Sequence, residues 1–516
     1  MFTEIELKLR LPPDRVSCLL RQPLLKSFTA SNPVTRRLYS IYYDTPDLDL
    51  RRRGFAFRLR RAGRCWFQTI KGGGAATAGL HLRNESEAQV LKAQPDFTKI
   101  GDPPLARLFA STTLRGQLHP LFVTDFSRTT RLLKLPDGSE AELCIDRGKI
   151  TSDSKNEPVC EIELELRSGR TSALFQLALD LLQSVPFRLE NVSKAEQGYA
   201  LATGSWSPPT KAAPVQLHAE MSADEAFGAI SWNCLGHLHG NEAGMLQGRD
   251  IEYLHQMRIA LRRLRTSLSL FSKLRPGITP GPLVQELKWL SGKFGPARDW
   301  DVFVAETVAH VTSHFPGYPG ITELKDRCER RRRHYNHEAE CALYSQRYTE
   351  LMLKLSIWLC TECRNESSVT SGEDAPLDLK PKIFIKGFSR ALLENRRRQL
   401  GKYGKRLASL DEAELHALRI VLKKHRYAAE FFAGIYSHKK TRRYIQSLSR
   451  VQDTLGTLND AANARQLLSE VSFENDGKDL HEAAGIMLGW SASLGLCDKS
   501  QLMNAWVNFV ENETFW

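Results

Sequence analysis

The sequence predicts an α+β protein with a β-rich N-terminal domain and an all-helical C-terminal domain. Short runs of alternating polar and apolar residues fill roughly the first 200 positions, and a period of two is typical of strands. From about residue 221 the pattern changes to long amphipathic segments with clustered Arg and Lys. Since 516 residues exceed one ordinary core, we expect at least two domains.

The composition indicates an acidic partner. Lys and Arg number 72 and Asp and Glu 59, so the formal net charge is +13. Nucleic acid, polyphosphate and anionic lipid all satisfy this condition. The N-terminus does not resemble a signal peptide and no later apolar run is long enough to span a membrane, so we expect a soluble, cytoplasmic protein. The ten cysteines are scattered, which favours reduced core residues.

The first predicted strand carries acids and a base on one face. In Glu4-Ile-Glu6-Leu-Lys8 the charged residues alternate with apolar ones, so they point to one side. A second run, Glu161-Ile-Glu163-Leu-Glu165, repeats this pattern far downstream. A solvated surface strand has the same alternation, but two such strands favour a closed polar interior.

The remaining elements follow in chain order. Helical patterning is expected at about 13–26 and 171–183, and the composition of 205–214 is typical of a linker. We expect domains at 1–202 and 221–500, joined by a linker at 203–220. The predicted strands are 4–10, 37–43, 55–61, 64–71, 81–87, 121–134, 140–147 and 159–167.

Charges of both signs recur on nearly every predicted strand. These faces are therefore either all solvent-exposed or they line a polar barrel interior, because buried charges must be paired or must hold ligands. A polyphosphate and its metal satisfy the second condition. Mg²⁺ and Mn²⁺ bind carboxylate oxygens, whereas Arg and Lys bind phosphate oxygens.

An ordered set of motifs over about residues 1–202 resembles the CYTH domain, the triphosphate tunnel metalloenzyme family. The resemblance implies an eight-stranded antiparallel tunnel barrel that hydrolyses a phosphoanhydride of a bound triphosphate with a divalent metal. The motifs are Glu4-x-Glu6-x-Lys8, Tyr43-Asp44-Thr45-Pro46, Arg58-x-Arg60, Lys71, Asp146-x-Gly148, Glu161-x-Glu163-x-Glu165 and Ser193-Lys194-x-x-x-Gly198-Tyr199.

The same resemblance implies roles for individual residues. Catalysis is expected from Glu4, Glu6, Lys8 and Lys71. An alternative role applies to three acids, Glu165, Glu142 and Glu85: each is equally explained as a salt-bridge partner that orients a basic residue. The expected ligands of Mg²⁺ or Mn²⁺ are Glu4, Glu6, Asp146, Glu161, Glu163 and Glu165. The expected phosphate-binding residues are Lys8, Arg58, Arg60, Lys71, Arg83, Arg128 and Lys194.

Water is the expected nucleophile, because no Ser or Cys lies in an obvious activated arrangement. The Gly-rich segment 72–74 follows Lys71 and does not open a helix, which disfavours a P-loop enzyme. We expect hydrolysis of inorganic triphosphate to pyrophosphate and phosphate. Alternatives are a nucleoside or thiamine triphosphatase, a nucleotide cyclase of the same fold, and a non-catalytic protein that binds polyphosphate or nucleic acid.

The helical region contains an internal repeat. The segment 255–265 is echoed by 416–426, and Gly295–Asp299 is echoed by Gly456–Asp460. Both pairs have the same offset of 161 residues, from 255 to 416 and from 299 to 460. We therefore expect two related helical bundles, with repeats at about 250–305 and 411–466.

Each repeat carries a basic stripe on a predicted helix. A separate apolar stripe supplies the core contact: Met257, Leu261, Leu264, Leu268 and Phe271. A solvated charged face is the plain alternative, but acidic residues are scarce within these segments. The stripes are His255, Arg258, Arg262 and Arg265, then His416, Arg419, Lys423 and Arg426.

The pattern His-x-x-Arg-x-x-x-Arg-Arg-x-Arg followed by Gly-Pro-Ala-Arg298-Asp299 resembles a CHAD domain, over about residues 221–500. The resemblance implies a basic helical module that binds long-chain polyphosphate through the two stripes. Lys423 and Lys424 replace Arg in the second repeat, and Asn459 replaces Arg298, so the two halves need not bind equally. We expect neither a membrane nor nucleic acid as partner. His237-x-His239 is interpreted as structural, because two histidines alone do not make a metal site.

Overall fold

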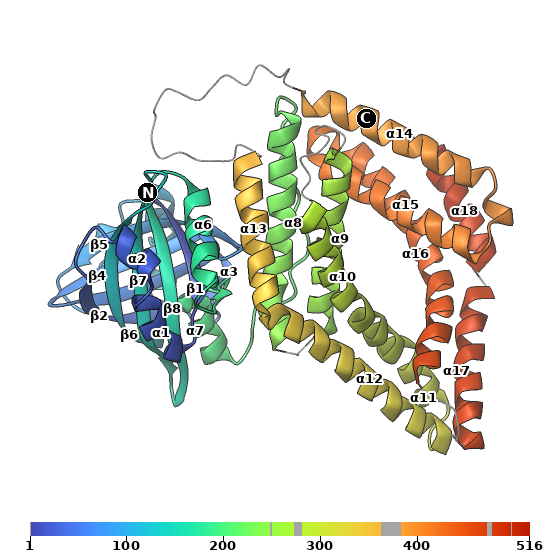
Figure 1. Ribbon diagram of the computed structural model, residues 1–516, viewed down its shortest axis with the longest axis horizontal. Helices are drawn as coiled ribbons and strands as arrows, with labels where there is room; N and C mark the ends of the chain where they lie inside the picture. Colours follow the sequence, from blue (N-terminus) through green and yellow to red (C-terminus); the bar gives the residue numbers. More distant parts are fainter. Residues whose placement is uncertain (1, 248–249, 273–280, 363–382, 472–476, 497) are drawn as a thin grey trace. The chain divides into compact units, whose positions relative to one another are not determined.

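The computed structural model describes residues 2–247, 250–272, 281–362, 383–471, 477–496 and 498–516 (Figure 1). The chain forms two compact units. Among the described residues, the first unit contains 2–210, 239–247 and 344–362, and the second contains the remainder. Two short parts of the later sequence therefore belong to the same unit as the N-terminal strands.

The first unit is built on a closed antiparallel barrel of eight strands. The strand order is β5-β4-β3-β2-β6-β7-β8-β1, and an additional β5 to β1 pairing closes the sheet, while the short β9 (Arg188–Leu189) extends β1. The strands are β1 (Phe2–Arg10), β2 (Val34–Asp44), β3 (Phe55–Ala62), β4 (Cys65–Thr77), β5 (Leu80–Val90), β6 (His119–Lys134), β7 (Glu140–Ser152) and β8 (Lys155–Ser168).

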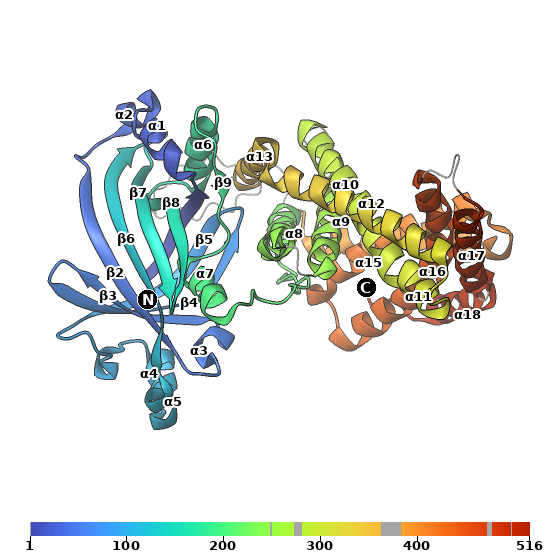
Figure 2. The same ribbon diagram turned by 90° about the horizontal axis from the view of Figure 1, so that it is seen from below.

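Short helices occupy the connections of the barrel. Figure 2 shows α4 and α5 together in the long connection between β5 and β6. The expected helix at 13–26 is η1 followed by α1 and α2, and the one at 171–183 is α6. The helices are η1 (Pro13–Arg15), α1 (Val16–Leu20), α2 (Pro23–Phe28), α3 (Asp49–Arg52), η2 (Phe97–Lys99), α4 (Pro103–Leu108), α5 (Thr112–Gln117), α6 (Thr171–Leu182) and α7 (Lys194–Thr203).

The barrel is apolar on its outer side where helices cover it. Leu7 and Leu9 alternate with the charged residues of β1 and are fully buried, and α6 packs against β1. The apolar side chains that a small barrel usually turns inward thus face the helices, which leaves the inner side to the polar residues.

The second unit is helical. The helices that follow the barrel, including those shared with the first unit, are α8 (Ala223–Leu246), α9 (Ile251–Phe271), α10 (Gly281–Val302), η3 (Phe303–Val308), α11 (Ala309–His314), α12 (Pro319–Tyr344), α13 (Gln346–Glu362), α14 (Ile385–Gly404), η4 (Leu407–Ser409), α15 (Glu412–Phe431), η5 (Ala433–Ile435), α16 (His438–Glu470), α17 (Lys478–Leu496) and α18 (Asp498–Glu511).

The two copies of the internal sequence repeat lie in corresponding helices. The segment 255–265 lies in α9 and its counterpart 416–426 lies in α15. Asp250 caps α9 and Asp411 caps α15, again 161 residues apart (250 to 411), and Asp411 forms a capping box with Glu414. The predicted apolar stripe is confirmed, since all five of its side chains are buried.

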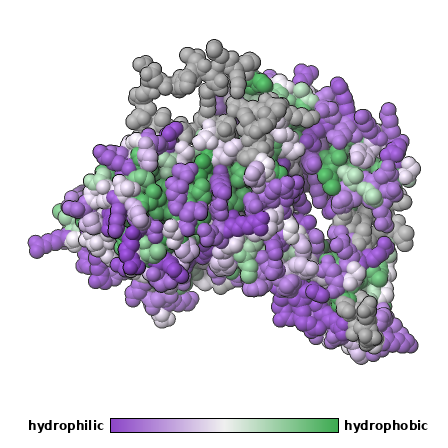
Figure 3. Space-filling model, in the orientation of Figure 1, coloured by the Kyte–Doolittle hydropathy of each residue, from purple (hydrophilic) through white to green (hydrophobic). Residues whose placement is uncertain are grey.

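Hydrophilic side chains cover most of the face drawn in Figure 3. Within the described ranges, no helix combines the length and the apolar character needed to cross a membrane.

Candidate functional site

The interior of the barrel is charged, as the alternation predicts. Glu6 and Lys8 of β1, Arg58 of β3, and Glu161 and Glu163 of β8 are all less than a tenth exposed. The charges are arranged by sign around the barrel. Acids gather on the neighbouring strands β7, β8 and β1, which form the acidic wall. Bases gather on β3 and β4, which form the basic wall together with Arg83 of β5, a strand that also carries the acids Glu85 and Glu87.

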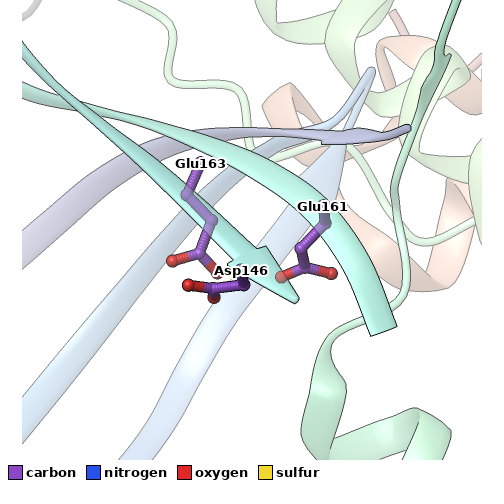
Figure 4. A group of neighbouring side chains, drawn as sticks. All are labelled: Asp146, Glu161 and Glu163. Carbon is purple, nitrogen blue, oxygen red and sulfur yellow. The ribbon is translucent and has the colours of Figure 1, made fainter. Parts of the chain in front are cut away.

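Three carboxylates of the acidic wall converge. Asp146 of β7 pairs with Glu161 of β8 in the sheet register, and Glu163 follows two residues later on the same face. Their oxygens lie within 4.8 Å of one another and all three side chains are buried. Figure 4 shows the three carboxyl groups turned toward a common point.

Cationic side chains already neutralise this acidic cluster. The Lys194 ammonium of α7 lies 2.7 Å from Asp146 and 2.9 Å from Glu163, and it also pairs with Glu161. Arg128 of β6 donates two hydrogen bonds of 2.7 Å to the two oxygens of Asp146. Without such partners, three buried carboxylates would repel strongly.

The three acids differ in proton affinity. Burial raises the pKa of Glu161 to about 7, although Lys194 and Lys8 oppose the shift. Burial also acts to raise the pKa of Glu163, but Arg128, Lys194 and Lys8 hold it well below its usual range. Glu161 is therefore the acid of this group that can gain or lose a proton near neutral pH.

The other three predicted metal ligands lie outside that cluster. Glu4 pairs with Lys71 at 2.6 Å, and Glu6 pairs with Lys8 at 3.0 Å. Glu165 forms an ion pair of 2.7 Å with Arg167. Burial raises the pKa of Glu165 to about 7, with further contributions from Glu4, Glu142 and Glu6.

The basic wall contains cations without acidic partners. Arg58 lies 3.5 Å from Glu85, and Lys71 lies 2.8 Å from the same residue. In the part of the chain that the structure describes, Arg60 and Arg83 form no ion pair. Burial, followed by the neighbouring Arg58 and Arg128, lowers the pKa of Arg60 to about 10. This wall is thus arranged to receive an anion.

The helix α7 explains the motif Lys194-x-x-x-Gly198-Tyr199. Lys194 reaches the acidic cluster, whereas a Cβ at Gly198 would lie 2.1 Å from the ring of Phe122, so only glycine allows this approach. The Tyr199 hydroxyl donates a 2.9 Å hydrogen bond to Asp44. Asp44 also accepts backbone N–H groups of residues 45, 50 and 51. The motif at 43–46 therefore anchors the helix that carries Lys194.

The sequence prediction omitted two interior residues. Tyr42 follows the same alternation as Asp44 on β2 and accepts a 3.4 Å hydrogen bond from Arg58. Burial favours its neutral form, but Arg58 and Arg60 outweigh that effect and lower the pKa of Tyr42. His81 of β5 is buried and lies 2.8 Å from the carbonyl of Glu190. Alternation along β2 and β5 was the signal that could have identified both.

The acidic cluster is compatible with a divalent cation. Its donors are hard carboxylate oxygens, which Mg²⁺ and Mn²⁺ prefer. Because Lys194 lies among these oxygens, a metal and this ammonium compete for the same ligands.

In the helical unit the two basic stripes face one another. The helices α9 and α15 are in contact, and Arg262 and Arg258 of α9 both act on Lys423 of α15. Burial, followed by these arginines and by Arg419, lowers the pKa of Lys423 to about 7. The repeats thus combine their cations in one basic helical face, a convergence that the sequence did not predict. The face consists of His255, Arg258, Arg262, Arg265, His416, Arg419, Lys423 and Arg426.

Individual contacts in the face follow the repeat. Arg258 donates to the carbonyl of Gly295 at 3.2 Å, and the Arg419 guanidinium lies beside Gly456, 3.7 Å from the position of an added Cβ. Arg258 also forms a 2.6 Å ion pair with Asp299. The side chains at 458–462, which include the predicted counterparts of Arg298 and Asp299, lie outside the described residues.

Two further members of the face have partners. Arg265 donates to Ser291 at 3.1 Å, and Arg426 pairs with Glu430 at 3.2 Å. The pKa of His255 is lowered to about 4, mainly by burial and further by Arg298 and other nearby arginines. The face therefore has a few acidic partners, but Arg262 forms no ion pair with any described residue.

The fold and its interior define a class of protein: a closed barrel with a charged interior, followed by a basic helical module. Comparison with known proteins identifies the two parts. Residues 3–199 match the CYTH domain and residues 229–469 match the CHAD domain, so the chain contains both.

Two relatives are similar to parts of the chain. An inorganic triphosphatase of Haemophilus influenzae is 34% identical over 209 residues, which is 39% of this chain and 56% of that protein. The chain thus spans little more than half of the length of that curated relative. The crystal structure of the CHAD domain from the plant Ricinus communis is 32% identical, with a TM-score of 0.52, and the match covers 60% of this chain and 98% of that one.

Proposed function

We propose that the barrel hydrolyses inorganic triphosphate to pyrophosphate and orthophosphate with Mg²⁺ or Mn²⁺. The observation that carries this proposal is the separation of charge inside the barrel. One wall gathers three buried carboxylates, and the other holds guanidinium groups without acidic partners. The relative that is named an inorganic triphosphatase supports the choice of substrate.

The basic wall is suited to hold the phosphate chain. Arg58, Arg60, Lys71 and Arg83 offer donors to the negatively charged oxygens, and a guanidinium can bind two oxygens at once. Their fixed positions orient the chain without a change in the protein, and such preorganised charge stabilises the charge that develops in phosphoryl transfer.

The acidic wall would hold the metal and handle the proton. Asp146, Glu161 and Glu163 are the residues that would bind a divalent cation, which when bound neutralises phosphate oxygens. The attacking water loses one proton as the phosphoanhydride bond breaks. Glu161, which has a pKa of about 7 while no metal is bound to it, is suited to accept this proton when Asp146 and Glu163 hold the metal. Lys8 and Lys194 keep the neighbouring acids ionised.

Release of orthophosphate tests this proposal. The full chain is incubated with tripolyphosphate, ATP, thiamine triphosphate or long-chain polyphosphate, with Mg²⁺, Mn²⁺ or a chelator. We expect release from tripolyphosphate that requires a metal and exceeds that from the other substrates. Absence of metal-dependent release from every substrate would contradict an enzymatic role, and a preference for ATP would replace the inorganic substrate.

We also propose that the basic helical face binds long-chain polyphosphate. The observation in its favour is the convergence of two stripes around Lys423, whose pKa is lowered by burial and by the neighbouring cations Arg262, Arg419 and Arg258. A linear polyanion supplies the missing negative charge along the face.

Charge reversal tests this second function. Arg262→Glu with Lys423→Glu should weaken polyphosphate binding about 10-fold or more at low salt, because repulsion replaces attraction. Arg398→Glu is a matched control, because this exposed side chain of α14 lies outside the face and pairs with its helical neighbour Glu394. Equal binding by both variants would count against the proposed face.

A further inference from the structure

A residue from the helical region reaches the barrel. His239 lies near the end of α8, within the CHAD match, yet it belongs to the first unit. Its Nδ1 accepts the backbone N–H of Ala78 at 3.0 Å. The side chain is buried, and burial lowers its pKa to about 3, so the ring stays neutral and Nδ1 keeps the lone pair that accepts this bond.

The turn that His239 contacts is conformationally demanding. Ala78 and Gly79 form the two-residue connection between β4 and β5, and their φ angles are +54° and +75°. Two positive φ angles suit a tight hairpin, but alanine adopts this region only when its surroundings hold it there. Both backbone N–H groups of the turn are held by side chains, since Asn191 Oδ1 accepts that of Gly79 at 2.8 Å.

This turn also holds the backbone of Lys8. The carbonyl of Gly79 accepts the Lys8 N–H at 2.8 Å, and the Lys8 carbonyl accepts the N–H of Glu190 at 2.9 Å. A Cβ at Gly79 would lie 2.9 Å from the Lys8 carbonyl oxygen, so the contact is close. The Lys8 side chain points into the barrel, where it pairs with Glu6 and Glu163.

A second side chain of α8 completes the arrangement. Glu242, which follows His239 by one helical turn, accepts a 3.3 Å hydrogen bond from the Asn191 amide and a 3.0 Å bond from the Tyr348 hydroxyl of α13. Glu242 is buried. Asn191 therefore connects Gly79 to the carboxylate of Glu242 on α8, which Tyr348 of α13 holds from the other side of the bond network.

We propose that His239 and Glu242 are positioning residues for the barrel. They hold the turn between β4 and β5, and through it the backbone of Lys8, so that residues from the CHAD match form part of the catalytic unit. This inference rests on the proposed hydrolysis for its kinetic readout, but not for its structural one.

The test compares variants of the full chain. In His239→Ala the N–H of Ala78 loses its acceptor, and we expect kcat to fall about 10-fold, with a smaller change in KM, because the reacting groups are misplaced more than the substrate is lost. His239→Asn restores kcat, since its Oδ1 occupies a position similar to that of Nδ1. Glu242→Gln is expected to act in the same direction as His239→Ala. Hydrogen exchange of the backbone amides in residues 75–82 and 3–10 should accelerate in His239→Ala and recover in His239→Asn.

His237→Ala is the matched control. His237 is equally buried and lies two residues away on the same helix, but its Nε2 contacts Gln256 and not the turn. If His237→Ala lowers kcat and accelerates exchange at the turn as much as His239→Ala does, the effect is general loss of stability and the proposal is wrong. Unchanged kcat and exchange in His239→Ala would also overturn it.

Hydrolysis by the barrel and the positioning role of His239 are tested by different measurements. If the unmodified chain hydrolyses none of the substrates, the proposed function fails. The exchange rates at the turn and at β1 then still decide whether His239 holds them.

Discussion

The barrel interior and the basic helical face both concentrate cations, but they balance them differently. Inside the barrel, Lys8, Lys194 and Arg128 are paired with buried acids, and only part of the basic wall lacks partners. On the helical face, Arg262 and Lys423 gain little from acids, whereas Arg258 and Arg426 each form an ion pair.

This difference separates chemistry from binding. An interior that holds both signs can receive an anion together with a metal, and it can hold or release a proton. A face that is almost wholly cationic can bind a polyanion, and among the described residues it holds no cluster of carboxylates like that of the barrel. The comparison predicts that changes at the two sites have different and separable effects.

The largest effect is expected when the acidic wall is broken. Glu163→Gln leaves Lys8, Lys194 and Arg128 without a shared carboxylate, so triphosphate hydrolysis should fall about 100-fold or more. Loss of one partner from a buried ion pair should also lower the free energy of unfolding by about 3 kcal/mol. Phosphate release and chemical denaturation measure the two quantities.

Glu157→Gln is the control on the same strand. Glu157 pairs with Arg10 at a partly exposed position, so its loss should change stability by less than about 1 kcal/mol. Polyphosphate binding should persist in the folded Glu163→Gln protein. If that binding disappears along with hydrolysis, the two sites are not separable.

The next effect concerns the basic wall. Arg60→Met should raise the KM for triphosphate about 10-fold, because one unpaired guanidinium is lost. Stability should stay the same or increase, since Arg60 is buried beside Arg58 and Arg128 and its pKa is lowered to about 10. Steady-state kinetics and thermal unfolding check these expectations. A strong loss of stability would show that Arg60 has a structural role.

Disruption of the helical face should leave hydrolysis intact. The single change Arg262→Glu is expected to weaken polyphosphate binding about 5-fold, with no change in kcat for triphosphate. Titration at two salt concentrations measures the affinity, and the difference from the unmodified protein should shrink at high salt. A parallel loss of kcat would argue against two independent sites.

The smallest effect is the pH dependence of polyphosphate binding. Lys423 has a pKa of about 7 in the free protein, and a polyanion favours its protonated form. Affinity should therefore be highest below pH 7 and fall about 3-fold as the pH rises to 8.5. Lys423→Arg stays charged over this range, so its affinity should change less with pH. Equal pH profiles for both proteins would assign the dependence to another group.

Much of the barrel could be predicted from sequence, because side chains along a strand point alternately to its two faces, with a period of two residues. Each of the eight predicted strands overlaps one observed strand, and part of the predicted inner face is buried, including Lys8, Arg58 and Glu163. The expected eight-stranded antiparallel barrel is confirmed. The short β9 and the helices α3, α4 and α5 escaped prediction because each is too brief to show a period.

Contacts between distant segments were not accessible in the same way. Alternation places Asp146 and Glu161 on inner faces, but it does not show that Lys194, from a helix, reaches both. The repeat predicts two basic stripes without showing that they meet around Lys423. The contact of His239 with Ala78 depends on tertiary packing that a single sequence does not encode locally.

The ammonium of Lys194 gives the acidic cluster a cation of its own. Together with Arg128 and Lys8 it balances the charge of the three carboxylates before any ion arrives, so the entry of a divalent cation would be an exchange rather than an addition. Tyr199 and Gly198 fix the helix that carries Lys194. Only the flexible side chain of Lys194 therefore has to move when a metal replaces its ammonium, and the backbone stays in place. Under the proposed function, folding and metal loading are thereby uncoupled, and we expect a chelator to stop hydrolysis while the barrel remains folded.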